Sequence, residues 1–151
     1  MGEFAIRPAV DFEGPVLGDI FVAARRVALP FLREPHSPAE MRAWICDVVV
    51  PRQTTWVAER GGQIAGFMTL DGEEVEHLYL DPDMTRSGIG SALIAFAKAQ
   101  SPGRLVLTCF AQNQPARRFY EAHGFHAVSF GDGTGNEESA PDVVYEWRGG
   151  G

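Results

Sequence analysis

The sequence predicts a single α/β domain with one central sheet, mixed and mostly antiparallel, flanked by helices. The first observation is the length of 151 residues, which suits one compact domain and leaves little room for a second. The second is a change of hydrophobic period, because stretches with helical spacing lie on both sides of a run of strands. The third is an apolar fraction of 45%, ordinary for a globular chain. We therefore expect residues 1–151 to form one domain with frayed C-terminal glycines and the element order β-α-α-β-β-β-α-β-α-β-β.

The N-terminal third predicts a strand and two helices. Residues 4–7 form a short strand candidate, and a helix follows within 11–32 because apolar residues repeat at helical spacing until Pro30. Ser37 has the features of an N-cap, with proline next and an acid three positions on, and opens a helix that extends to about Val49. The expected apolar face of the first helix comprises Val16, Ile20, Ala23, Ala24 and Val27.

The middle of the chain changes to strand spacing. Residues 54–59, 63–70 and 74–80 each alternate apolar and polar side chains or form short apolar runs. The glycine-containing segments 60–62 and 71–72 between them are typical of hairpin turns. We therefore expect three consecutive antiparallel strands.

The C-terminal part returns to helices that alternate with strands. Residues 104–110 form a nearly continuous apolar run, as expected for a strand covered on both faces. Gly124 is a natural left-handed end for the helix before it. The remaining expected elements are a helix over 88–100, a helix over 113–123, and strands over 125–130 and 143–147.

Charge and cysteine content exclude several kinds of function. Thirteen Lys and Arg against twenty Asp and Glu give a net charge of −7. That balance is unsuited to non-specific binding of nucleic acid or to an anionic membrane surface. Two cysteines are too few for a disulfide framework or a Cys-rich zinc site, and no apolar run has the length of a membrane span or the features of a signal peptide. We therefore expect a cytoplasmic protein with no nucleic-acid, membrane or metal partner.

A glycine turn follows the third of the three strands. Residues 78–80 run into a turn, and Gly88 and Gly90 open the next helix. The first amides of a helix have no internal partner and carry the positive end of its dipole, so glycines there let an anion approach the backbone. Arg86 would add a side-chain charge. The turn fits a phosphate cradle, although a G-x-G pair alone fits a tight turn before a helix equally well.

Two better-known glycine motifs do not fit this segment. A dinucleotide fingerprint needs a third glycine where this sequence has Leu93. A Walker A loop needs Gly-Lys followed by Ser or Thr, and that sequence is absent. A second motif resolves the ambiguity, because residues 113–125, after the next expected strand, read NQPARRFYEAHGF.

Residues 78–91 and 113–125 together resemble the GNAT superfamily of acyl-CoA-dependent N-acetyltransferases. That family carries L-Y-V-x-P, then Q/R-x-x-G-x-G/A, and further on N-x-x-A-x-x-x-Y-E-x-x-G-F. Here the first two read LYLDP and TRSGIG. One departure is Thr85, where the family usually has Gln or Arg, and it puts one phosphate contact in doubt. The resemblance covers residues 54–130 well, and two motifs at this separation are much more specific than either alone.

The resemblance implies that acetyl-CoA is the co-substrate, and no metal is expected beside it. In GNAT proteins the pantetheine arm lies in a V-shaped gap beside the strand before the glycine turn, like an extra strand. Asn113 would hydrogen-bond the arm, and an amide near Leu80 would polarise the thioester carbonyl. The strand and the amides of the glycine turn would supply the other contacts: Leu78, Tyr79, Leu80, Arg86, Ser87, Gly88, Ile89, Gly90 and Ser91.

Two side chains are the expected catalytic groups. By the resemblance, Tyr120 would protonate the departing thiolate of CoA, although without the family pattern it would be taken for a half-buried core aromatic. A neutral amine nitrogen needs a base or a proton-accepting water, and Glu76 is the best candidate for the base. Strand alternation would place Glu76 on the face of Leu78 and Leu80, with His77 on the other face unless a bulge intervenes.

The resulting expectation is an enzyme that transfers acetyl from acetyl-CoA to a primary amine by direct attack in a ternary complex. A non-catalytic acyl-CoA-binding or regulatory module on the same fold is an alternative, and so is an enzyme that acetylates protein N-termini or lysines. The acceptor is a small molecule or a peptide. Segments 71–83 and 131–146 are rich in Asp and Glu and contain no Lys or Arg. Their negative charge favours a cationic amine as the acceptor. The resemblance also leads us to expect a homodimer.

Overall fold

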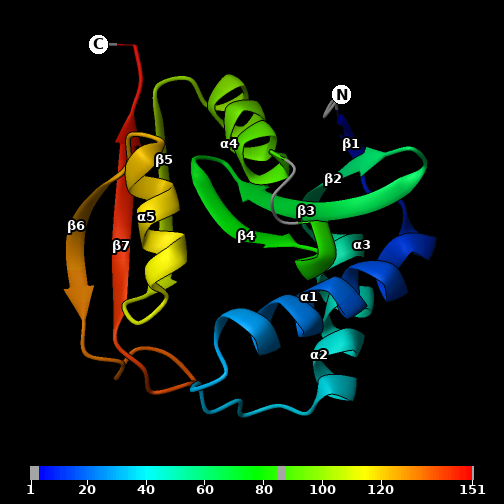
Figure 1. The fold of residues 1–151 in the computed structure, drawn as a ribbon, viewed down its shortest axis with the longest axis horizontal. Coiled ribbons are helices and arrows are strands. Elements are labelled where there is room, and N and C mark those ends of the chain that lie inside the picture. Colours follow the sequence, from blue (N-terminus) through cyan, green and yellow to red (C-terminus); the bar gives the residue numbers. More distant parts are fainter. Residues whose placement is uncertain (1–3, 85–87, 151) are drawn as a thin grey trace.

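The computed structural model describes residues 4–84 and 88–150 (Figure 1). Its strands are β1 (Ala5–Pro8), β2 (Thr54–Arg60), β3 (Gln63–Asp71), β4 (Glu74–Leu80), β5 (Arg104–Phe110), β6 (His126–Gly131) and β7 (Asp142–Arg148). Its α-helices are α1 (Gly14–Ala28), α2 (Pro38–Trp44), α3 (Val50–Arg52), α4 (Ile89–Gln100) and α5 (Gln114–Ala122). Short 3-10 turns η1 (Asp11–Glu13) and η3 (Pro82–Met84) and a π-helical turn η2 (Ile45–Val49) complete the order.

All seven strands form one sheet in the order β1-β2-β3-β4-β5-β7-β6. Every neighbouring pair is antiparallel except β4 and β5, which are parallel. The predicted mixed, mostly antiparallel sheet flanked by helices is therefore confirmed. Helix α4 connects β4 to its parallel neighbour β5, so the chain crosses one face of the sheet between these two strands.

Helices cover both faces of the sheet around β3 and β4 (Figure 1). Helix α1 and turn η2 pack on one face, where Leu17, Phe21 and Ile45 are buried against Phe67 of β3. Helices α4 and α5 pack on the other face and share a larger core with β5 and β7. These two layers fix the position of β4 and β5, between which the candidate site lies.

A β-bulge interrupts the pairing of β3 with β4. Thr69 pairs with His77, while the next residue, Leu70, pairs with Val75. Glu76 is therefore an extra residue on β4, and the regular alternation of side chains breaks there. The alternation on which the prediction for Glu76 rested is therefore interrupted at that residue, whereas His77 lies on the face opposite to Leu78 and Leu80, as predicted.

Helix α1 buries a different stripe from the predicted one. Ile20 is buried as expected, but Val16 and Val27 are 46% and 67% exposed. The buried stripe also includes Leu17, Phe21 and Arg25, which follow one another at four-residue intervals. In the part of the chain that the structure describes, no helix has the length and apolar character needed to cross a membrane.

Gly124 ends α5 in a left-handed conformation, with φ of +88°. Its amide donates to the carbonyl of Glu121, and the amide of Phe125 donates to that of Tyr120. A Cβ at this position would also lie 3.3 Å from the ring of Trp147.

We expect Gly124→Ala to lower the free energy of unfolding by about 1–2 kcal/mol, because alanine is strained at positive φ. Urea denaturation measures the change. Gly103→Ala is the matched control, since a Cβ there has no atom within 4 Å and its φ is not in the left-handed region. Equal stability of the two variants would contradict the assignment of Gly124 as a helix end that needs positive φ.

Candidate active site

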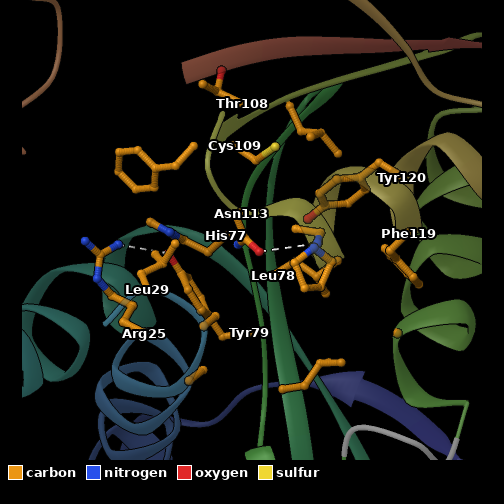
Figure 2. Close-up of a pocket in the computed structure, with 18 of the residues that line it drawn as sticks. Arg25, Leu29, His77, Leu78, Tyr79, Thr108, Cys109, Asn113, Phe119 and Tyr120 are labelled. Carbon is orange, nitrogen blue, oxygen red and sulfur yellow. Dashed lines mark hydrogen bonds between the residues drawn. The ribbon is translucent and has the colours of Figure 1, made fainter. Parts of the chain in front are cut away.

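Strands β4 and β5 diverge and leave a cavity of about 550 Å³ between them. In the described chain they pair at one register position only, Glu74 with Val106, whereas β3 and β4 pair along their length. Beyond that position the cavity is lined by the C-terminal halves of both strands, by α5 and by the end of α1 (Figure 2). A volume of this size is typical of ligand sites, which range over roughly 300–1,000 Å³.

The Tyr120 side chain is 9% exposed, and its hydroxyl points into the cavity (Figure 2). Its ring packs against Phe119, Phe125 and Tyr145, with centroid distances of 5.3, 5.7 and 6.2 Å. Burial raises the pKa of the Tyr120 phenol. Within residues 4–84 and 88–150 its hydroxyl makes no hydrogen bond. The group is therefore a neutral proton donor whose partner is not supplied by the described chain.

Asn113 caps the N-terminus of α5 and lines the same cavity. Its Oδ1 accepts a hydrogen bond from the amide of Ala116 at 3.3 Å, the contact drawn in Figure 2. Among the described residues, its Nδ2 donates no hydrogen bond. One end of the amide thus fixes the side chain while the other end can bind a carbonyl in the cavity.

The end of β4 presents different residues to the two faces of the sheet. Leu78 and Leu80 pack against the core on the α4–α5 face. His77 and Tyr79 contact Phe21 on the α1 face, with Tyr79 at a centroid distance of 4.8 Å. All four residues line the cavity, and three of them, Leu78, Tyr79 and Leu80, are residues predicted to contact the pantetheine arm.

The first turn of α4 follows the glycine turn. Gly88 is its N-cap, with φ of +84°, and a Cβ there would meet no atom within 4 Å. Ile89 and Gly90 are buried, and the Ser91 hydroxyl lies 3.0 Å from Nε2 of His123. The predicted contacts at Arg86 and Ser87 lie outside the described residues, as does Thr85.

Glu76, the extra residue of the β-bulge, lines the cavity at the end where β4 and β5 still pair. Its side chain is exposed, in contrast to the buried Val75 beside it. The pKa of the Glu76 carboxyl is raised, first by partial burial and then by the negative charges of Glu74 and Asp71. A raised carboxyl pKa makes the group a better proton acceptor near neutral pH.

His77 is poorly suited to accept a proton. Its ring packs between Trp44 and Phe21, with centroid distances of 5.1 and 6.4 Å. Burial, and then the charge of Arg25, lower the pKa of the imidazole to about 4. His77 is therefore neutral and weakly basic at physiological pH.

A buried charge network closes the α1 end of the cavity, and sequence reasoning missed it. Arg25 is 7% exposed and lines the cavity. Its Nε and Nη2 donate to the two oxygens of Glu34 at 2.9 and 2.8 Å, and Nη2 also donates to Glu138 at 3.0 Å. Its Nη1 lies 3.4 Å from the Tyr79 hydroxyl (Figure 2). The network joins α1 to the loops that precede α2 and β7.

One sequence signal could have identified this network. Arg25 follows Leu17 and Phe21 at four-residue intervals, so it lies on the buried stripe of α1. A buried arginine requires carboxylate partners. The sequence could not name them, because Glu138 lies 113 positions away.

We expect Arg25→Met to destabilise the fold by about 3 kcal/mol, because it leaves Glu34 and Glu138 mostly buried without their cation. Urea denaturation at neutral pH measures the loss. Arg26→Met is the matched control, since Arg26 is the next residue of α1 and is exposed. A loss no larger than that of the control would contradict the role of Arg25 in joining the two loops.

Two further side chains, on β5 and α5, have structural roles. Burial raises the pKa of the Cys109 thiol to about 11, which disfavours a nucleophilic thiolate. Arg117 donates from Nε to the Tyr145 hydroxyl at 3.0 Å. The Tyr145 hydroxyl donates to Glu121 at 2.7 Å.

The described residues fit the acetyl-CoA that the resemblance implies. The unpaired edges of β4 and β5 leave backbone groups available to an extended arm. Asn113 offers an amide, and Tyr120 offers a proton donor inside the same cavity. The open, left-handed Gly88 leaves the first amides of α4 accessible to an anion.

The chain is similar to known proteins in sequence and in fold. The sequence model of the "Acetyltransferase (GNAT) family" matches residues 21–125. The chain is 27% identical over 143 residues to "Peptidyl-lysine N-acetyltransferase YiaC" of Escherichia coli, covering 94% of this chain and 95% of that protein. It is 35% identical over 91 residues to "Peptidyl-lysine N-acetyltransferase YjaB" of Escherichia coli, an alignment that spans 61% of that protein.

Solved structures have the same fold. The solution structure of apo YjaB from Escherichia coli superposes with a TM-score of 0.84 at 26% identity, covering 98% of this chain and 99% of that one. The PaiA N-acetyltransferase from Thermoplasma acidophilum in complex with coenzyme A superposes with a TM-score of 0.70 at 18% identity, covering 97% and 99%. At 18% identity, the similarity to the PaiA structure shows a shared fold alone.

Proposed function

The chain belongs to the acetyltransferase (GNAT) family, and we propose that it acetylates the side-chain amine of lysine in a peptide or protein. The observation that carries this proposal is that a proton donor, Tyr120, and a carboxylate, Glu76, line one cavity between β4 and β5. Two relatives from Escherichia coli named as peptidyl-lysine N-acetyltransferases support the choice of acceptor. The cavity wall on α1 is mostly apolar, which suits the four-carbon stem of lysine.

In the proposed mechanism acetyl-CoA supplies the activated acyl group, and the protein supplies orientation and proton transfer. Glu76, directly or through a water, accepts a proton from the attacking amine. The Tyr120 hydroxyl donates a proton to the sulfur that leaves, which a neutral phenol with a raised pKa can do. The backbone near Leu80 and the Asn113 amide hold and polarise the thioester.

The residues that contact acetyl-CoA are proposed from their positions in the sequence motifs and in the fold. Backbone groups of Leu78, Tyr79 and Leu80 would pair with the pantetheine arm in the gap beside β4. The first amides of α4, at Ile89, Gly90 and Ser91, would bind the pyrophosphate behind the turn at Gly88. Arg86 and Ser87 are assigned to the same phosphate cradle from the sequence motif, since they lie outside the described residues.

A cationic acceptor is also part of the proposal. Asn136, from the acidic segment before β7, and Asp142, the first residue of β7, line the cavity, and Glu76 lines it from β4. Two carboxylates in this lining favour an ammonium ion over an anionic acceptor, because the cation of Arg25 is already paired with Glu34 and Glu138. A cytoplasmic location and a homodimer remain predictions of the sequence.

The experiment that tests the proposed function is thiol release from acetyl-CoA with two matched peptides. One peptide has a blocked N-terminus and a single free lysine, and the other is the same peptide with that lysine already acetylated. We expect thiol release and a one-acetyl mass gain with the first peptide only. Binding of CoA without thiol release for any amine would favour a non-catalytic acyl-CoA-binding module.

A further inference from the structure

A second cavity of about 250 Å³ lies on the other side of Glu76. It is bordered by the end of α3, the start of β2 and the end of β3, through Arg52, Thr54 and Asp71. These three side chains are exposed, so the cavity opens to solvent. Glu76 lines this cavity and also the cavity between β4 and β5. The β-bulge thus places one carboxylate in the wall between two separate spaces.

The second cavity is polar and suited to water. Besides Glu76, it is lined by the polar side chains of Arg52, Gln53, Thr54 and Asp71. A polar space of this volume can hold bound water. The hydroxyl of Thr54 and the carboxylate of Asp71 offer hydrogen-bond partners to such waters.

We propose that this second cavity is the route by which the proton taken up by Glu76 leaves the enzyme while both substrates fill the cavity between β4 and β5. The proposal rests on the proposed function of Glu76 as base. In the step, the N–H bond of the acceptor breaks and an O–H bond forms on Glu76. The proton then passes to water in the second cavity and to solvent, and Glu76 returns to its carboxylate form.

The charges around Glu76 make Asp71 a positioning residue for this step. Glu74 comes from the same strand, Asp71 from β3 and Arg52 from α3. Removal of the Asp71 charge lowers the pKa of Glu76, because a neighbouring negative charge favours its protonated form. We expect Asp71→Asn to move the acidic limb of kcat/KM for the acceptor to lower pH.

Asp83→Asn is the control for this shift, because Asp83 is an exposed carboxylate in η3 that lines neither cavity. The same acceptor peptide is used throughout, so its own titration is common to every profile. An acidic limb that moves equally in both variants, or in neither, would contradict the role of Asp71.

Blocking the cavity tests the route itself. Thr54→Leu fills part of the second cavity, whereas Thr54→Ser leaves it open. We expect Thr54→Leu to lower kcat several-fold and to enlarge the solvent deuterium isotope effect on kcat, with the KM for acetyl-CoA unchanged. Thr54→Ser should match the natural sequence, and circular dichroism confirms that both variants fold.

Equal kcat and isotope effects in the Thr54→Leu and Thr54→Ser variants would overturn the proposed route while acetyl transfer persists. Failure of the proposed function has a different signature, because then the natural sequence itself transfers no acetyl group. The two failures are therefore distinguishable in the same set of assays.

Discussion

Tyr120→Phe is expected to lower kcat about 100-fold with a lysine peptide as acceptor, because the leaving sulfur loses its proton donor. The phenyl ring can keep the contacts with Phe119, Phe125 and Tyr145, so the affinity for CoA should stay nearly unchanged. Steady-state thiol release gives kcat, and calorimetric titration with CoA gives the affinity.

Tyr145→Phe is the matched control for this change. It also removes one phenol, but the Tyr145 hydroxyl is held between Arg117 and Glu121 and does not line the cavity. We expect it to cost about 1 kcal/mol of stability and little turnover. Unchanged turnover of the Tyr120→Phe variant would rule out the proton-donor role.

Glu76→Gln is expected to lower kcat/KM for the acceptor about 100-fold near neutral pH, because the amide cannot accept a proton. In the natural sequence the carboxyl must be ionised to act, so kcat/KM rises with pH through its pKa. That pKa is raised by burial and by Glu74 and Asp71, so the acidic limb lies above that of an ordinary glutamate. The pH profile of kcat/KM shows whether this limb disappears in the variant.

Asp83→Asn is the control, since Asp83 is an exposed carboxylate in η3 and lines neither cavity. We expect its turnover to stay close to that of the natural sequence. An unaltered acidic limb in Glu76→Gln would instead assign proton removal to a chain of waters or to another group.

Most of the fold could be predicted from sequence because the signals are local. The predicted strands over 74–80 and 104–110 have the observed bounds, and the other elements differ by a few residues at their ends. Glycines at the two hairpin turns and at Gly124 mark positions that need positive φ, which other residues rarely adopt. The two motifs in turn place the Asn113 and Tyr120 side chains in one cavity.

The parts that the sequence could not predict depend on pairing between distant segments. The bulge at Glu76 follows from the register of β3 against β4, which no local pattern determines. The partners of Arg25 come from two loops, one of them 113 positions away. Val27, expected in the core of α1, instead lies exposed on the cavity wall, because the gap between β4 and β5 leaves this end of the helix uncovered.

A crystal structure of the chain with CoA and a lysine peptide tests the central claim most directly. We predict that the pantetheine arm lies between β4 and β5, with the sulfur within about 3.5 Å of the Tyr120 hydroxyl. The lysine nitrogen should face Glu76 directly or through one water. A pantetheine arm outside this gap, or a sulfur on the side away from Tyr120, would contradict the assignment of the cavity as the site of acetyl transfer.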